Sequence, residues 1–285
     1  MKAGFVGLGY IGKPMAQRLP AAGIETAVFD IAPAPVKELA AGGAKAATSA
    51  REVAAASEVV GVCVQTDEQV RTVVAGEDGI LAGAAPGLVI VIHSTILPST
   101  VEAMAALAAK QGVDVVDACV SGNVRAADPM FKLFAGGDAG VLARIEPYLR
   151  AIAADRVIRT GPLGTGCKTK ICVNLITYLQ WTAAFEAATL ARAVGLPLET
   201  LEQAGRSNGQ LTELMIAYLG THKMPESMRK SEAMQHYLRT QMHVAEKDLA
   251  CALQLAREGG VALPGTALVS QLMARIYTIE DPGRR

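Results

Sequence analysis

The stretch that decides the fold lies at the amino terminus and reads Gly4-Phe5-Val6-Gly7-Leu8-Gly9-Tyr10-Ile11-Gly12-Lys13-Pro14-Met15-Ala16. It contains a Gly-x-Gly-x-x-Gly pattern between a predicted strand over 3–6 and a predicted helix over 13–22. In such a pattern the first glycine permits a tight turn, the second lets a pyrophosphate approach the backbone, and the third lets helix and strand pack closely. The N–H groups at the helix start can then face the phosphates.

The pattern alone is weak in a chain with 28 glycines, but its place between a strand and a helix predicts a dinucleotide-binding turn. We expect the backbone contacts to the cofactor to come from Gly7, Leu8, Gly9, Tyr10, Ile11 and Gly12. The alternative is a tight strand–helix turn that binds no ligand.

An acidic residue, Asp30, ends the second predicted strand, over 26–30. A carboxylate in this place can accept hydrogen bonds from the ribose hydroxyls of a dinucleotide, and it would repel a 2′-phosphate. The next residue is Ile31 rather than an arginine, and Lys37 is expected on a helix surface. The sequence therefore predicts NAD rather than NADP as the cofactor, unless Asp30 is only a helix cap or a loop acid.

Short β-branched runs alternate with Ala-rich helical stretches through the first half of the chain. The predicted strands cover 3–6, 26–30, 59–64, 88–92, 113–117, 132–135 and 156–159, and the intervening helices include 13–22, 33–41, 49–56 and 99–111. Apolar residues make up 51% of the chain and aromatic residues only 4%, which suits helices packed on a parallel sheet. The pattern predicts an α/β fold with a doubly wound, mainly parallel sheet of the Rossmann type.

Helices alone are expected after about residue 160, where the Gly- and Pro-rich run 161–166 interrupts the pattern. A helical pattern then runs over 167–194 without an internal Gly or Pro, which corresponds to a helix about 40 Å long. Its many apolar residues indicate burial on most sides. Further helices are predicted over 198–205, 211–219, 241–258 and 266–277, with a less regular stretch over 224–237. We expect a dinucleotide-binding domain, 1–163, and an all-α domain, 164–285.

Composition excludes several classes of function. The 27 basic and 27 acidic residues cancel, so there is no electrostatic case for binding nucleic acid or an anionic membrane. No run of about 18 apolar residues occurs, and the first strand starts too early for a cleavable signal. An odd number of cysteines, five, without a Cys-x-x-Cys pair favours a reduced, cytoplasmic setting. No metal-ligand spacing is evident, so we expect no metal site.

The glycine-rich opening resembles the signature of the 3-hydroxyisobutyrate dehydrogenase family, the β-hydroxyacid dehydrogenases of the 6-phosphogluconate dehydrogenase-like superfamily. Further segments match in the same order. The first is Ser94-Thr95-Ile96-Leu97-Pro98-Ser99-Thr100, which follows the predicted strand over 88–92. The resemblance implies that Ser94 and Thr95 lie against the nicotinamide half of the cofactor. Hydroxyls at the carboxyl end of a sheet strand sit where ligands bind in open α/β folds.

The next segment, Asp117-Ala118-Cys119-Val120-Ser121-Gly122-Asn123, resembles the substrate loop of the family. The resemblance implies that the substrate carboxylate is held by Ser121, Gly122 and Asn123. Charge-assisted hydrogen bonds of this kind are strong ones. Cys119 replaces the usual proline and Asn123 the usual second glycine, which leaves the substrate open. Arg125 either pairs with an acid group of the substrate or is a solvated surface residue.

The third segment, Gly164-Thr165-Gly166-Cys167-Lys168-Thr169-Lys170-Ile171-Cys172-Val173-Asn174, resembles the Gly-x-Gly…Lys-x-x-Asn-Asn motif of the family. Lys170 falls on the catalytic lysine and Asn174 on the second asparagine, while Val173 has replaced the first. Because they are spaced i, i+4, Lys170 and Asn174 share a helix face, which can point both groups into an interdomain cleft. Lys168 points elsewhere and is expected at the surface.

The last segment, Glu246-Lys247-Asp248-Leu249-Ala250, resembles the Lys-Asp-Leu-x-Leu-Ala segment on a late helix of the family. The resemblance implies that Lys247 reaches the cofactor. The alternative is a surface charge pair of Lys247 and Asp248, which would contribute roughly 0–1 kcal/mol.

The resemblance implies an oxidoreductase that transfers hydride reversibly between NAD and the carbinol carbon of a small 3-hydroxy acid or a similar hydroxy acid. Lys170 would take the hydroxyl proton and return it in the reverse direction, while Asn174 orients the reacting groups. A free lysine, with a pKa of about 10.4, is a poor base at neutral pH. Burial and a positive nicotinamide nearby would both disfavour its charged form.

Two other functions are left open by the sequence. One is a reductase of a related imine or sulfonate-bearing aldehyde, although imine-reducing relatives usually lack the lysine. The other is a non-catalytic protein that senses NAD, against which the retention of Lys170 and Asn174 argues. The segment 208–241 departs most from the family pattern and could line the substrate pocket. The resemblance also implies a homodimer or homotetramer that associates through its helical domains.

Overall fold

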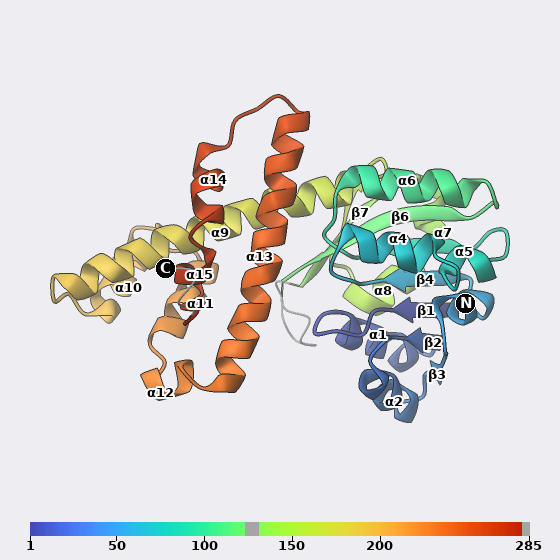
Figure 1. Cartoon of the computed structure of the whole chain (residues 1–285), viewed down its shortest axis with the longest axis horizontal. Coiled ribbons are helices and arrows are strands. Elements are labelled where there is room, and N and C mark those ends of the chain that lie inside the picture. Colours follow the sequence, from blue (N-terminus) through green and yellow to red (C-terminus); the bar gives the residue numbers. More distant parts are fainter. Residues whose placement is uncertain (123–130, 281–285) are drawn as a thin grey trace. The chain divides into compact units, whose positions relative to one another are not determined.

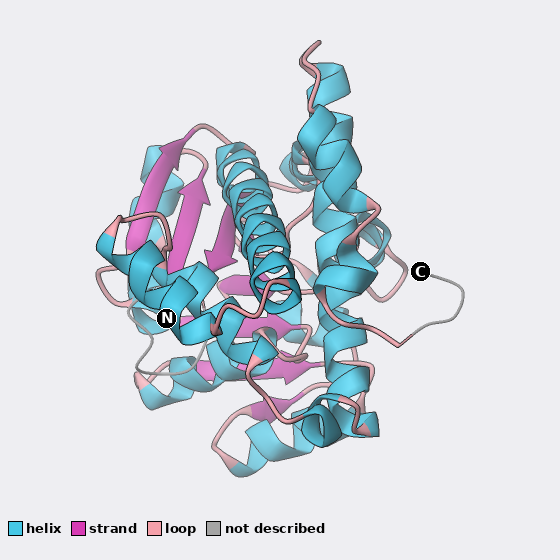
Figure 2. Ribbon diagram, turned by 90° about the vertical axis from the view of Figure 1, so that its left-hand side faces the viewer, coloured by secondary structure: helices cyan, strands magenta, loops and turns pink. Residues whose placement is uncertain are grey.

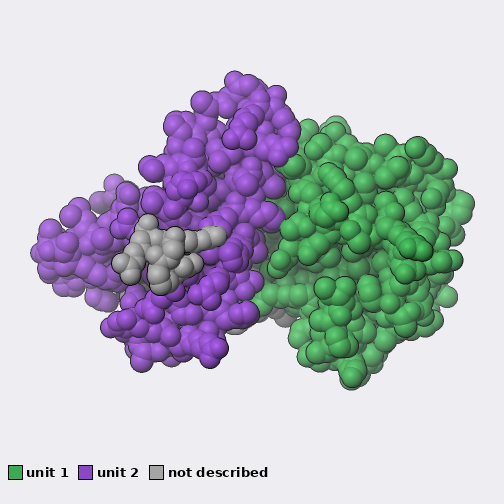
Figure 3. All heavy atoms as spheres, in the orientation of Figure 1, with its two compact units in different colours: residues 1–170 green, residues 171–285 purple. Residues whose placement is uncertain are grey.

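The computed structural model describes residues 1–122 and 131–280 of the chain (Figure 1). The chain divides into two compact units, Met1–Lys170 and Ile171–Arg285 (Figure 3). The division falls inside one long helix, α9 (Thr165–Ala193). The first six residues of α9 therefore belong to the first unit.

An eight-stranded sheet forms the centre of the first unit. Its strands, in chain order, are β1 (Lys2–Val6), β2 (Glu25–Phe29), β3 (Lys45–Ala46), β4 (Val59–Val62), β5 (Val89–Ile92), β6 (Asp114–Ser121), β7 (Lys132–Gly136) and β8 (Val157–Gly161). Their order across the sheet is β3-β2-β1-β4-β5-β6-β7-β8, and every neighbouring pair is parallel except β6 and β7. The predicted doubly wound, mainly parallel sheet is confirmed. The order reverses between β1 and β4, where open α/β sheets bind ligands.

Helices pack on both faces of the sheet. Figure 2 shows the strands in magenta and the helices in cyan. Alternate residues of β5 separate into two cores: Val89 and Val91 join one, and Ile90 and Ile92 the other. One face is covered by α1 (Gly12–Ala21), α2 (Pro33–Ala41), α7 (Ala139–Arg144) and α8 (Glu146–Ala153), and the other by α3 (Ala50–Ala55), α4 (Asp67–Ala75), α5 (Ile80–Gly83) and α6 (Pro98–Ala109). Burial on two faces explains why the strands are continuous apolar runs.

The described part of the second unit contains helices and no strands. After α9 come α10 (Leu198–Ser207), α11 (Glu213–His222), α12 (Glu226–Arg229), α13 (Glu232–Glu258), α14 (Pro264–Ser270) and α15 (Met273–Ile276). The helix α13 begins nine residues before the predicted start at 241, because the side chain of Ser231 caps it by accepting from the N–H of Met234. Among the described residues, no helix combines the length and apolar content that crossing a bilayer requires.

The expected burial of α9 on most sides is wrong for the single chain. One face contributes Tyr178, Ala184 and Ala188 to the core of the second unit. The side chains of Ile176 and Leu190, by contrast, are 54% and 64% exposed. A helix packed by one stripe leaves its other apolar residues open, however many the sequence contains.

A buried histidine joins the strand ends of the first unit. His93 directly follows β5, and its ring stacks on Phe5 with 5.7 Å between centroids. Its Nδ1 donates to the carbonyl of Ala118 over 2.7 Å, and its Nε2 accepts from the hydroxyl of Tyr148 over 2.9 Å. Burial lowers the pKa of His93 to about 4, because a charged ring would be desolvated and Tyr148 would lose its acceptor.

This pKa makes stability depend on pH. Because the folded pKa is below that of the unfolded chain, the unfolded state binds a proton first as the pH falls from 6.5 towards about 4. We expect His93 to cost roughly 3 kcal/mol of unfolding free energy over this interval. The variant His93→Asn keeps a donor for the carbonyl of Ala118 but does not titrate. Its free energy of unfolding, measured by chemical denaturation, should therefore fall less between pH 7 and pH 4 than that of the wild type. The control is His243→Asn on an exposed histidine, and equal pH slopes for wild type and His93→Asn would refute the assignment.

Candidate functional site

The glycine turn between β1 and α1 has a different constraint at each of its three glycines. Gly7 adopts a φ of 92°, and a Cβ there would lie 2.4 Å from the carbonyl oxygen of Cys63. A Cβ at Gly12 would lie 1.9 Å from the carbonyl oxygen of Gly7. Gly9 is exposed and would place a Cβ in open space. The turn thus fits a dinucleotide phosphate, since two glycines make it tight and the third leaves its backbone accessible.

Asp30 follows β2 and holds this turn in place. One carboxylate oxygen accepts from the N–H of Leu8 over 2.5 Å, and the other accepts from the N–H of Ala32 over 2.8 Å. The residue is only partly buried. Each carboxylate oxygen can accept more than one hydrogen bond, so Asp30 can hold the turn and also accept from a ribose hydroxyl. Ile31 and Lys37 are both exposed, as expected for Lys37.

Ser94 lies at the end of β5 and is buried, with 3% of its surface exposed. Its hydroxyl accepts from the N–H of Val64, over 3.0 Å, and thereby joins the ends of β4 and β5. Thr95 is half-buried. Of the two residues predicted to face the cofactor, Ser94 therefore forms a structural bridge, and Thr95 is the less buried.

Lys170 and Ser121, predicted from separate segments, lie together. The Nζ of Lys170, in the second turn of α9, donates to the hydroxyl of Ser121 at the end of β6 over 3.4 Å. Both side chains are half-buried. Gly122 is exposed and adopts a φ of 84°, a region that favours glycine. Lys168, two residues before Lys170, is exposed as expected.

Two residues of the predicted substrate loop, Asn123 and Arg125, lie outside the described residues. Their predicted contacts with the substrate stay predictions. The described end of the loop is Gly122, which directly follows Ser121 and β6.

In the second unit, three donors converge on one buried carboxylate. Asp248, on α13, is 2% exposed and accepts from Asn174 Nδ2 over 2.6 Å, from the hydroxyl of Tyr178 over 3.1 Å and from Lys247 Nζ over 2.7 Å. Its burial is incompatible with a surface charge pair of Lys247 and Asp248. Burial raises the pKa of the Tyr178 hydroxyl well above its usual range, and the charge of Asp248 adds to this effect.

The sequence suggested no role for Asp248 itself. Its side chain nevertheless contacts Asn174 and Lys247, both of which were predicted to belong to the site. It binds the amide nitrogen of Asn174, and this orients the amide oxygen away from the carboxylate. Asn174 is thus held as an acceptor for a donor elsewhere, such as an ammonium or a hydroxyl. The signal available in the sequence was the spacing of Asn174 and Tyr178 by one helical turn, which puts two donors on one face of α9.

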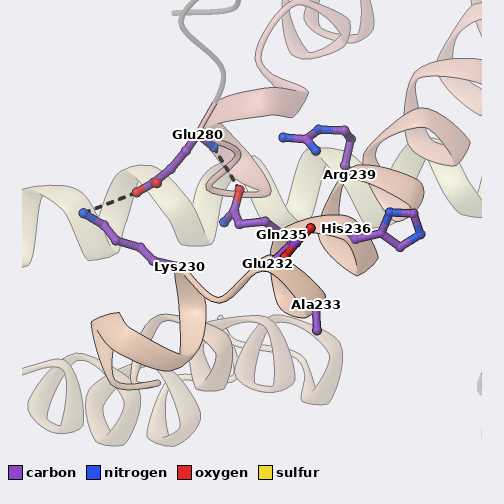
Figure 4. Close-up of a pocket in the computed structure, with 7 residues that line it drawn as sticks. All are labelled: Lys230, Glu232, Ala233, Gln235, His236, Arg239 and Glu280. Atoms are coloured by element: carbon purple, nitrogen blue, oxygen red, sulfur yellow. Dashed lines mark hydrogen bonds and ion pairs between the residues drawn. The ribbon is translucent and has the colours of Figure 1, made fainter.

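A separate hollow of about 650 Å³ lies in the second unit between α12, α13 and the residues after α15 (Figure 4). It contains none of the predicted site residues. Lys230 pairs with Glu280 across it, over 3.3 Å, and Gln235 accepts from the N–H of Glu280. These contacts hold the carboxyl-terminal segment to α13, so they assign no chemistry to the hollow. In the described part of the chain, no three His, Cys, Asp or Glu side chains are grouped so as to hold a metal ion.

The convergence on Asp248 gives a stability prediction. The donors Asn174 and Tyr178 face one carboxylate oxygen, and Lys247 faces the other. An amide at this position has only one acceptor oxygen, so its NH₂ group must face at least one of these donors. We expect Asp248→Asn to lower the free energy of unfolding by roughly 1–3 kcal/mol, the usual cost of leaving a buried polar group unpaired. Chemical denaturation measures it, with Glu258→Gln, an exposed change on the same helix, as the matched control. A loss no greater than that of the control would mean that the donors do not depend on the carboxylate.

Comparison with known proteins assigns the family. Residues 2–168 match the family model described as the NAD binding domain of 6-phosphogluconate dehydrogenase. Residues 164–282 match the model described as NAD-binding of NADP-dependent 3-hydroxyisobutyrate dehydrogenase. Both NAD(P)-binding models match in chain order and together cover nearly the whole chain.

Individual relatives agree with this assignment. The chain is 34% identical to 2-(hydroxymethyl)glutarate dehydrogenase of Eubacterium barkeri, over 95% of this chain and 88% of the relative. It is 31% identical to 3-hydroxyisobutyrate dehydrogenase of Pseudomonas aeruginosa, over 95% and 90%. The structure of Mycobacterium tuberculosis 3-hydroxyisobutyrate dehydrogenase with L-serine superposes with a TM-score of 0.79 at 28% identity, covering 97% of this chain and 94% of that one. The chain therefore belongs to the 3-hydroxyisobutyrate dehydrogenase type of NAD(P)-binding oxidoreductases.

Proposed function

We propose that the protein is an NAD(P)-dependent β-hydroxyacid dehydrogenase that interconverts a small 3-hydroxy acid, or a similar hydroxy acid, with its aldehyde or keto acid. The observation that carries the proposal is the pair of Lys170 and Ser121, whose Nζ and Oγ atoms lie 3.4 Å apart. A proton-transfer group and a substrate-binding hydroxyl thus meet at the carboxyl end of β6, in the unit that holds the dinucleotide turn. Family membership supports the same chemistry.

Lys170 acts as the general acid and base in this proposal. In the oxidative direction it removes the hydroxyl proton, and in the reductive direction it returns that proton. The bound nicotinamide supplies the hydride chemistry. Lys170 must be uncharged before it can accept a proton, and a positive nicotinamide bound beside it would disfavour its charged form. Asn174, one turn along α9 and fixed by Asp248, presents an amide oxygen that can orient a donor.

The substrate carboxylate is held by Ser121, Gly122 and Asn123 in this proposal. The exposed backbone of Gly122 and the hydroxyl of Ser121 are donors that suit a carboxylate. Lys170 donates to the same hydroxyl, so binding the acid group of the substrate also sets the distance from the amine to the carbinol oxygen.

The cofactor is NAD rather than NADP in this proposal. The carboxylate of Asp30, fixed to the glycine turn through the N–H of Leu8, would accept from ribose hydroxyls and repel a 2′-phosphate. The residue that follows Asp30 is Ile31, so no cationic side chain comes directly after it to pair with a 2′-phosphate. The backbone from Gly7 to Gly12 holds the pyrophosphate, Thr95 and the backbone of Ser94 face the nicotinamide half, and Lys247 contacts the cofactor.

Residues 1–163 serve as the dinucleotide-binding domain in this proposal, and residues 164–285 as the helical domain for substrate binding and subunit association. The exposed apolar side chains of α9, among them Ile176 and Leu190, support association into a homodimer or homotetramer. Burial of such side chains is the usual driving force for a permanent interface.

The role of Lys170 is tested by Lys170→Met in purified protein. With a panel of 2- and 3-hydroxy acids, including 3-hydroxyisobutyrate, L-serine and 2-(hydroxymethyl)glutarate, and their aldehydes, we expect kcat to fall by about 10²–10⁴-fold. NAD affinity, measured by fluorescence titration, should be retained because the dinucleotide turn is untouched.

The matched control is Lys168→Met, which removes the same charge from an exposed position two residues away. It should turn over at the wild-type rate. Undiminished turnover by Lys170→Met would refute the catalytic role. No turnover of any hydroxy acid or aldehyde by the wild type, with NAD still bound, would favour a sensor, whereas turnover of imines or sulfonate-bearing aldehydes alone would reassign the substrate.

Cofactor choice is tested by Asp30→Asn, which removes the charge and keeps one acceptor for Leu8. We expect kcat/KM for NAD to fall about tenfold, the effect of about 1.4 kcal/mol, and its ratio to that for NADP to fall with it. Glu25→Gln is the control, because it removes an exposed carboxylate from the other end of β2. An unchanged NAD-to-NADP ratio in Asp30→Asn would show that Asp30 does not select the cofactor.

A further inference from the structure

A buried carboxylate lies at the start of α9 and takes no part in the chemistry described so far. Asp117, on β6, has no exposed surface. Its Oδ1 accepts from the N–H of Gly164 over 2.8 Å, and its Oδ2 accepts from the N–H of Cys167 over 2.7 Å. The first N–H groups of a helix have no partner within the helix, and an anion near them is favoured by the helix dipole. Asp117 therefore caps α9 from a neighbouring strand.

Two glycines leave the space that this carboxylate occupies. A Cβ at Gly136, on β7, would lie 2.8 Å from Oδ1 of Asp117, and a Cβ at Gly166, on α9, would lie 2.8 Å from Oδ2. The Cβ at Gly166 would also lie 2.4 Å from the carbonyl oxygen of Phe134. The carboxylate is thus enclosed by backbone on both sides. Such tight packing fixes the position of the start of α9, in addition to the hydrogen bonds that Asp117 makes with it.

The same face of β6 contacts α9 three times. Residues 117, 119 and 121 alternate along the strand and so point to one side of the sheet. Asp117 binds the N–H groups of Gly164 and Cys167, the thiols of Cys119 and Cys167 lie 3.3 Å apart, and the hydroxyl of Ser121 contacts Lys170. Lys170 follows Cys167 by three residues, slightly less than one helical turn. A displacement of the helix start is therefore carried to Lys170.

We propose that Asp117 is a positioning residue for proton transfer, because its two hydrogen bonds set the place of α9, and hence of the Lys170 amine, relative to Ser121. The inference rests on the proposed catalytic role of Lys170. The two hydrogen bonds of Asp117, at 2.8 Å and 2.7 Å, are shorter than the 3.4 Å contact between Lys170 and Ser121, and they are buried. They therefore constrain the start of the helix that carries Lys170.

Removing acceptors from Asp117 should therefore act on the chemical step. Asp117→Asn keeps one acceptor oxygen and Asp117→Ala keeps none. We expect kcat for the hydroxy acid to fall by about tenfold in the first and about a hundredfold in the second, because misplacement of a catalytic group by about 1 Å is enough for such losses. KM for the hydroxy acid and the affinity for NAD should change by less than about threefold, since Ser121 and the glycine turn are unaltered.

The matched control is Asp138→Asn. Asp138 also caps a helix of the first unit, α7, by accepting from the N–H groups of Gly140 and Val141, so its side chain holds the start of α7 rather than that of α9. Its loss should lower thermal stability and leave kcat unchanged. Chemical denaturation of each variant establishes that it is folded under the assay conditions.

A second arm separates positioning from a general structural effect. In the Lys170→Met background, Asp117→Asn should no longer slow the residual hydride transfer measured in single turnovers, because the group it positions is gone. An equal fold-loss in both backgrounds would overturn the proposal, as would a kcat in Asp117→Asn equal to that of Asp138→Asn. If Lys170→Met itself turned over normally, the proposed function would fail first, and that outcome is distinct from both.

Discussion

The proposed chemistry of this protein depends on how the first turns of α9 are held against the end of β6. The helix begins at Thr165, directly after a Gly- and Pro-rich turn that would not fix its direction. A carboxylate, a thiol and a hydroxyl on one face of β6 each contact it. The strand is itself held inside the sheet, between β5 and β7. In the proposed function, this rigid sheet fixes the place of the Lys170 amine, as precise catalysis requires of any scaffold.

Polar side chains at the strand ends form hydrogen bonds within the protein, and some of them are also candidates for binding a ligand. Asp30 holds the glycine turn and has acceptor capacity left for a ribose. Ser94 uses its hydroxyl to join two strands, although its position at the strand end is also one where a cofactor is proposed to bind. His93 stays neutral between Ala118 and Tyr148. Buried polar groups need hydrogen-bond partners, so the buried polar side chains at this end of the sheet are paired with other groups of the protein.

The sequence was sufficient to predict those features that depend on local pattern. Parallel strands buried on both faces are continuous apolar runs, and all seven predicted strands lie on observed ones. The helix α4 is not among the helices named from the sequence, although Thr66 and Gln69 form a capping box at its start. The two-residue strand β3 is too short to leave a pattern. The exposed apolar side of α9 could not be predicted. When a helix has apolar residues on all sides, its sequence does not show which face packs against the rest of the chain.

For the candidate site, the resemblance implied separate roles for Lys170 and Ser121, and the structure brings the two side chains together. Asp117 and Asp248, which hold the elements that carry site residues, were given no role. Asp117 binds backbone N–H groups at the start of α9, and Asp248 binds side chains of α9 as well as its neighbour Lys247. The pairings with α9 are set by tertiary packing, and for Asp248 the sequence offers only the one-turn spacing of Asn174 and Tyr178.

The proposed proton transfer requires the Lys170 amine to be uncharged for part of the time beside the reacting carbon. An NMR titration of the lysine side chains in the complex with NAD measures its protonation, with the Lys170 signal assigned by its absence from Lys170→Met. We expect the pKa of Lys170 in this complex to lie below that of a free lysine, about 10.4. A Lys170 signal that titrates at or above the free-lysine value would rule out this role.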